Sequence, residues 1–238
     1  MEKNKKISFN YIYPKMIDVF PAPIPMSKNI PQWYKDQPNY IVQENQPIDI
    51  TTIKGCQAIF DIITSGYLLL CPVDINIDTT ENNKIFNISE DYKKLNTPLV
   101  GSHQMEQISH YPFNHDFFTE YLFRVNMAWV VETEKGYSCL FMEPQHQDYI
   151  PMHAVSAIID TDAFMSDGLF SFFVDKGFKG TIKKGTPLVQ VFPFKRDDGV
   201  ADFNKNFDLK ILNKQRKKIR SLFIGGYKKF YWHKKSYK

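Results

Sequence analysis

The chain has 238 residues, 43% hydrophobic and 15% aromatic, and its 20 Phe and 13 Tyr residues favour one large β-rich domain over a helix bundle. No window is apolar for long enough to form a membrane-spanning helix, and the charged residues 1–6 are not followed by the apolar stretch of a signal peptide, so we expect a protein that is not secreted. Residues 204–238 carry 12 of the 30 Lys and Arg residues but one of the 26 acidic residues, so a basic tail follows an acidic body.

Two kinds of segment open the chain. Residues 1–13 alternate apolar and polar side chains, which predicts a strand. The proline-punctuated residues 20–38 cannot form a helix interior or a central strand, so we expect an extended or polyproline-II arm. Its predicted anchors are Ile24, Met26, Trp33 and Tyr34.

The middle of the chain reads as a short helix followed by many short strands. An apolar face predicts a helix over residues 53–65, ended by Gly66. Strands are predicted at 67–77, 84–88, 121–126, 129–133, 137–142, 153–159, 169–174, 179–182 and 187–194. This spacing indicates a mainly β fold, a β-sandwich or a β-clip-like barrel, with Trp129 and Leu188 in its core.

The C-terminal segment is predicted to be a separate tail, so that residues 1–200 form one β-rich domain and residues 201–238 a basic helical and aromatic tail. Residues 206–223 have apolar side chains on one side of a helix and lysines on much of the rest. Residues 227–238 alternate aromatic side chains with lysines. Three interpretations stay open: the tail folds onto its own body, it binds nucleic acid through residues 205–238, or it binds another partner. That partner could be an acidic protein surface, another copy of the chain contacted through the proline-rich arm and the tail, or a membrane interface.

Residues 154–194 resemble part of the dUTPase and dCTP-deaminase superfamily. The sequence Ile-Ile-Asp-Thr-Asp-Ala-Phe is similar to that family's "G-x-I-D-x-D-Y" hairpin, and Gly185 and Gln190 match its closing strand. The resemblance implies a β fold with Asp160 as the base that activates water, and with Phe164 and Gln190 at a bound nucleotide. The family's Arg-Ser phosphate-binding motif and its glycine-rich C-terminal arm have no counterpart in this sequence.

Over most of its length the chain also resembles a family of uncharacterised proteins from tailed bacteriophages. The resemblance lies in the order of short motifs, which stand here at Pro21–Lys35, Thr64–Tyr67, Gly136–Phe141, Ile159–Asp162 and Gly185–Arg196. It implies a viral origin, with the protein in the cytoplasm of the infected host or in the virion. It implies no activity.

Histidines and carboxylates form two candidate metal sites. His146, Asp148 and His153 have the composition of the facial triad that binds Fe(II) in oxygenases, although the same residues also suit a solvated loop. The second candidate is the histidine-rich segment with His103, His110 and His115. Neither set has the spacing of a zinc site, and the three cysteines, Cys56, Cys71 and Cys139, are expected to be reduced and mostly buried.

Asp160 and Asp162 complete the candidates for catalysis. A spacing of two places both carboxylates on one face of a strand, where one could act as a general base. If the protein is an enzyme, Mg²⁺ or Fe(II) is the expected cofactor. The alternative is a turn whose carboxylates bind the backbone. Because no catalytic motif is complete, we expect a viral protein that acts by binding or assembly, with a diverged nucleotide-binding protein or an iron oxygenase as the alternatives.

Overall fold

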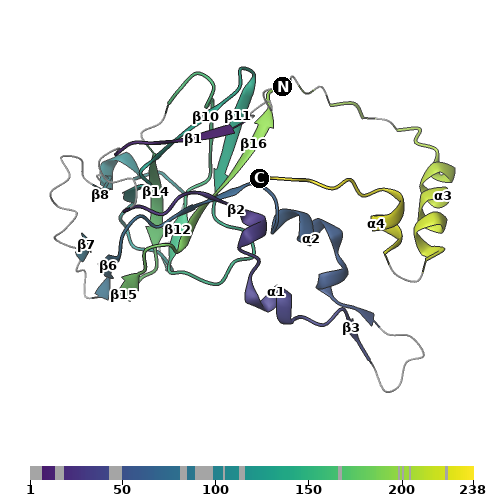
Figure 1. Ribbon diagram of the computed structural model, residues 1–238, viewed down its shortest axis with the longest axis horizontal. Coiled ribbons are helices and arrows are strands. Elements are labelled where there is room, and N and C mark those ends of the chain that lie inside the picture. Colours follow the sequence, from purple (N-terminus) through teal and green to yellow (C-terminus); the bar gives the residue numbers. More distant parts are fainter. Residues whose placement is uncertain are drawn as a thin grey trace. The chain divides into compact units, whose positions relative to one another are not determined.

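The computed structural model describes residues 7–13, 19–42, 50–80, 85–88, 99–103, 105–112, 116–165, 168–197, 199, 201–203, 205–222 and 225–238. The chain forms two compact units. Unit 1 comprises residues 1–24 and 66–196 and contains most of the strands, whereas unit 2 comprises residues 25–65 and 197–238 and contains the α-helices (Figure 1).

One sheet of unit 1 is built around a long central strand, β16 (Pro187–Lys195). It pairs antiparallel with β5 (Tyr67–Leu70) on one side and with β11 (Tyr137–Met142) on the other, and β11 pairs in turn with β13 (Ala157–Ile159). Leu188, Val189, Gln190 and Val191 are all buried, so β16 is covered on both faces. Figure 1 shows β11 and β16 running side by side.

A second sheet has the strand order β12-β14-β9-β8. Its strands are β12 (Met152–Ala154), β14 (Leu169–Val174), β9 (Phe123–Asn126) and β8 (Val100–Ser102), all paired antiparallel. Two smaller sheets complete unit 1. The first pairs β1 (Ile7–Tyr11) with β10 (Trp129–Thr133), and the second has the order β15 (Lys179–Ile182), β6 (Ile75–Asp78), β7 (Ile85–Ile88).

Side chains from the two larger sheets meet in one hydrophobic core. Phe141 of β11 and Phe170 of β14 pack with ring centroids 4.9 Å apart, and Leu188 is fully buried. The described sheets are open, with no closed barrel among them. The mainly β, sandwich-like fold expected from the strand spacing is therefore confirmed.

Trp129 lies at the edge of this core. The ring is half-buried rather than fully enclosed, and its Nε1–H donates to the Pro21 carbonyl oxygen at 3.0 Å. The predicted core residue thus packs against the core from its boundary, where the indole N–H has an acceptor. Two of the three thiols, Cys71 and Cys139, are buried, and Cys56 is exposed.

Unit 2 contains short elements. They are the 3₁₀ turns Met26–Lys28 and Ile53–Gly55, α1 (Gln32–Asp36), β3 (Tyr40–Ile41), β4 (Ile50–Thr51), α2 (Gln57–Ile62), α3 (Leu209–Arg220) and α4 (Gly226–Phe230); β2 (Ile24–Pro25) lies where unit 1 ends. The predicted helix over 53–65 is thus split in two, and the basic helix predicted over 206–223 is shorter, with Phe223 outside the described residues. No helix in the described ranges is both long and apolar enough to cross a bilayer.

The expectation of an extended arm over residues 20–38 is wrong in part. Residues 26–28 and 32–36 are helical, because Pro25 and Pro31 stand at the N-cap position, where a missing N–H breaks no helical hydrogen bond. The predicted anchors Met26 and Tyr34 are buried as expected.

Candidate functional site

The Asp160–Asp162 pair lies in a turn that follows β13. Asp162 accepts the Gly136 N–H at 2.7 Å and the two Nη atoms of Arg196 at 2.5 and 2.7 Å. The Arg196 guanidinium, followed by the Gly136 N–H, lowers the pKa of Asp162 to about 2. Asp160 accepts the Ser138 hydroxyl at 2.7 Å and lies 3.2 Å from Arg196. Asp162 therefore connects its own turn to Gly136 by a hydrogen bond and to Arg196 by an ion pair. Asp160 is the more exposed of the two carboxylates.

The three residues assigned to a nucleotide by resemblance occupy two places. Phe164 belongs to the same turn as Asp160, since its N–H donates to the Asp160 carbonyl oxygen at 2.9 Å, and its ring is exposed. Gln190 is fully buried in β16, where its Oε1 accepts the Gln145 N–H at 3.0 Å. On β11, Ser138 faces the Asp160 turn and Met142 pairs with Gln190, a separation of roughly 13 Å along the strand. Gln190 thus supports a loop and does not face the turn.

The three candidate iron ligands, His146, Asp148 and His153, differ in exposure and in the contacts of their side chains. His146 and Asp148 are exposed in the loop after β11, and His146 has the left-handed φ of 56°. His153, on β12, contacts Glu143 through Nδ1 at 3.2 Å and Asp175 through Nε2 at 3.0 Å. Because both ring nitrogens of His153 face carboxylates, neither has a free lone pair aimed at a metal. Over the described ranges, no three His, Cys, Asp or Glu side chains are arranged to hold a metal ion.

The second histidine group forms no metal site among its described members, and His110 is exposed. His103 contacts Gln107 at 3.2 Å and Ser171 at 3.1 Å. His115 lies outside the described residues.

Sequence reasoning missed Glu143 and Asp175, the carboxylates around His153. Each directly follows a buried strand, β11 or β14, and β12 pairs with β14 so that His153 stands opposite Phe173. Their position directly after an apolar strand was the sequence signal that could have identified both carboxylates. Burial, followed by repulsion from Glu143, raises the pKa of Asp175.

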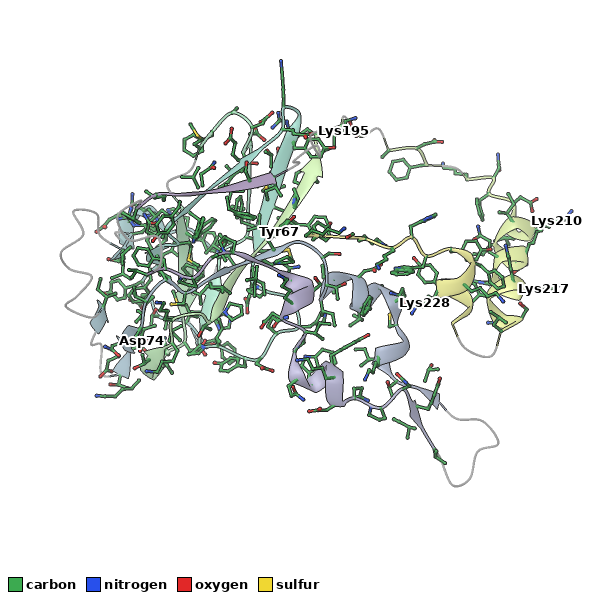
Figure 2. The ribbon with its side chains drawn as sticks, viewed as in Figure 1. Tyr67, Asp74, Lys195, Lys210, Lys217 and Lys228 are labelled. Carbon is green, nitrogen blue, oxygen red and sulfur yellow. The ribbon has the colours of Figure 1, made fainter. Side chains whose placement is uncertain are left out.

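The basic residues of the tail gather on a helical hairpin, here the α3–α4 hairpin. Asp208 caps α3 by accepting the Lys210 N–H at 2.8 Å, and no residue of α3 is buried. Lys210, Lys214 and Lys217 recur at i, i+4 and i+7 and therefore share one face of the helix. Figure 2 labels Lys210 and Lys217 on α3 and Lys228 on α4.

The opposite side of α3 is used for packing against α4. Leu212 and Ile219, which recur at i and i+7, are half-buried. A Cβ on Gly226 would lie 2.1 Å from the Ile219 carbonyl oxygen, so the two helices touch through backbone. Lys218 also leaves the lysine face, because its Nζ sits 4.8 Å from the centre of the Phe230 ring. The hairpin thus hides its apolar side and exposes its lysine face.

The end of the tail is attached to α2. Trp232 donates its Nε1–H to the Asp61 carboxylate at 2.9 Å, and Lys235 Nζ lies 2.6 Å from the same group. None of the ion pairs found among the described residues uses a cation of α3. Asp61 thus pairs with the end of the tail and not with the lysine face of α3.

Comparison with known proteins adds no family. No protein-family model matches the chain, and no curated protein sequence matches it either.

Proposed function

We propose that the protein acts by binding and not by catalysis, and that the α3–α4 hairpin is its contact element for nucleic acid. The observation that carries the proposal is the lysine face of α3. Lys210, Lys214 and Lys217 stand in line on an exposed helix with no acidic side chain paired to them in the described part of the chain. Cations repeated along one face track the phosphates of a nucleic acid backbone, and their attraction persists at distances of about 10 Å at 0.1 M salt.

Aromatic side chains beside the lysines support nucleic acid over a purely ionic partner. Phe203 and Phe207, which precede α3, have exposed fractions of 85% and 53%. Tyr227, at the start of α4, is also exposed. Rings next to a cationic track can stack on unpaired bases, each contributing about 1–3 kcal/mol.

The hairpin suits a membrane surface less well. An interfacial helix needs a continuous apolar stripe to insert among the acyl chains. Leu212 and Ile219 are turned toward α4, and the two exposed apolar residues, Leu209 and Ile211, lie about 200° apart around the helix. They flank the lysine face on opposite sides and form no stripe.

The resemblance to proteins of tailed bacteriophages supports the same proposal. A protein of the virion or of the infected host cytoplasm meets phage nucleic acid at high concentration. Two of the candidates for catalysis are engaged in other contacts, Asp162 with Arg196 and His153 with two carboxylates. An assembly role is compatible with this binding function.

The test is a binding titration with a triple variant. Fluorescence anisotropy with labelled single-stranded and duplex DNA at several salt concentrations should show binding that weakens as salt rises. K210Q/K214Q/K217Q should lose affinity and reduce the slope of log K against log [salt] by about 2–3, since each phosphate contact contributes about 0.7–0.9.

A matched variant controls for net charge. K135Q/K179Q/K183Q removes the same three charges from unit 1, and it should bind DNA nearly as well as the parent protein. An equal loss of DNA affinity in both variants would show that only the net charge matters, and it would contradict the α3–α4 hairpin as the contact element. Binding of anionic vesicles in preference to DNA would assign the hairpin to a membrane surface.

A further inference from the structure

A pocket of about 400 Å³ lies in unit 1, and none of the residues that line it belongs to the α3–α4 hairpin. It is formed by the loop after β11 together with one residue of β16. The residues around it are Glu143, Pro144, Gln145, His146, Gln147, Asp148, Tyr149, Ile150 and Pro187. The lining contains two carboxylates, Glu143 and Asp148, one imidazole, His146, and no Lys or Arg.

One wall of the pocket is backed by a chain of four hydrogen-bonded side chains. Glu143 contacts His153 Nδ1 at 3.2 Å, and His153 Nε2 contacts Asp175 at 3.0 Å. The Tyr149 hydroxyl donates to the other oxygen of Asp175. The first and last members, Glu143 and Tyr149, line the pocket, whereas His153 and Asp175 are largely covered.

Acidic groups outnumber basic groups in this chain. Two carboxylates, Glu143 and Asp175, face one imidazole, and the Tyr149 phenol donates to Asp175. Asp148 adds a further carboxylate, exposed in the pocket lining.

The remainder of the lining is mixed, with two amides, Gln145 and Gln147, beside apolar and aromatic side chains. Pro144, Ile150 and Pro187 offer a surface for an alkyl stem, and the Tyr149 ring can face a cation. Two features define the backbone of this loop. The Gln190 side chain accepts the Gln145 N–H, and His146 takes the left-handed conformation that non-glycine residues rarely adopt. The pocket is thus built into the folded loop.

We propose that this pocket binds a cationic nitrogen carried on an alkyl chain, an ammonium or a guanidinium group. The Glu143 and Asp148 carboxylates hold the charge, and the prolines and Ile150 contact the stem. A free alkyl amine and a Lys or Arg side chain of a partner protein share this chemistry. His153 and Asp175 position Glu143 and do not touch the ligand.

The experiment is an NMR titration of the full chain, following the backbone amides of residues 143–150. Butylammonium and butylguanidinium should shift them saturably, whereas butanol and butyrate of the same length should not. E143Q/D148N should weaken the interaction at least tenfold, and D74N/D78N, which removes the same charge from the β6 region, should leave it unchanged. D148N alone lies outside the bonded chain, so it should weaken binding even if loss of the Glu143 carboxylate perturbs the fold.

Two further ligands distinguish the sources of the cation. N-acetyl-lysine N-methylamide should match butylammonium if the pocket takes a protein side chain, and it should bind more weakly if the pocket takes a free amine. Butanol binding as tightly as butylammonium, or full binding by both D148N and E143Q/D148N, would overturn the proposal. DNA binding through α3 is measured separately and does not depend on this result.

Discussion

Gly66 and the Val191 carbonyl group approach each other so closely that a Cβ on Gly66 would lie 2.3 Å from the carbonyl oxygen. Gly66 also has a φ of 81°, which side-chain-bearing residues rarely adopt. Gly66→Ala should therefore destabilise unit 1 by about 1–3 kcal/mol from conformation alone, and by more from the backbone clash. Chemical denaturation of the purified variant measures the change.

Gly136→Ala is the matched control for this prediction. Gly136 has a similar φ of 88°, but nothing lies within 4 Å of its Cβ position. The alanine there should carry the conformational cost without the clash. Equal destabilisation by both substitutions would show that the close approach to Val191 relaxes easily.

The contact between Trp232 and Asp61 predicts how the tail end is held. Asp61→Ala removes the acceptor of the Trp232 indole and the partner of Lys235. A hydrogen bond to a charged group contributes about 1.5–3 kcal/mol, so residues 227–238 should open more often. Hydrogen exchange should speed up in that segment and stay unchanged in β16. Asp36→Ala on α1 is the control, and unchanged exchange in D61A would contradict the attachment.

Strand positions could largely be predicted from the sequence, because alternation and turn residues act locally. The strands at 129–133, 137–142, 169–174 and 179–182 were predicted at their observed bounds. The prediction joined β12 with β13, and β5 with β6, because apolar residues continue through both gaps; Pro72 and Asp74 were the local signals of the break between β5 and β6. Strand order depends on which distant runs pair, and the sequence does not encode that locally.

The contacts of His153 and Asp162 were harder to predict because their partners are far away in the chain. His153 was identified as a candidate ligand, but its partners are 10 and 22 residues away. Asp162 was paired with Asp160, whereas its strongest partner is Arg196, which directly follows β16 and lies 34 residues away in the chain. The lysine face of α3 was more accessible to prediction, since helical periodicity alone places its members together.

The Asp162–Arg196 pair predicts a stability loss in acid. The pKa of Asp162 is lowered to about 2, below its ordinary value near 4. A group with a depressed native pKa stabilises the fold above its ordinary pKa, and this contribution disappears as the pH falls from about 4 to 2. The melting temperature of D162N, which keeps an acceptor for the Gly136 N–H, should therefore fall less over this range than that of the parent.

Asp160→Asn provides the comparison on the same turn. It removes one carboxylate but leaves both Nη atoms of Arg196 on Asp162. Its acid profile should follow that of the parent protein. A D162N profile that coincides with the D160N profile would show that the pair does not contribute to acid sensitivity.

Leu188 tests the core of the two-sheet packing. The side chain is fully buried in β16, so Leu188→Ala should lower the free energy of unfolding by about 2–5 kcal/mol. Ile158→Ala, on the exposed face of β13, should change it by less than about 0.5 kcal/mol. Urea denaturation of both variants measures the difference, and equal small effects would contradict the placement of β16.

Of the three cysteine thiols, one is exposed to a labelling reagent in the folded protein. Burial raises the pKa of Cys71 to about 12 and that of Cys139 to about 11, so neither forms a thiolate at neutral pH. Cys56 is exposed at the N-cap of α2, five residues before Asp61. A maleimide dye will therefore label the folded chain once, on the helix that holds the end of the tail, and its emission can follow release of that tail without any engineered cysteine.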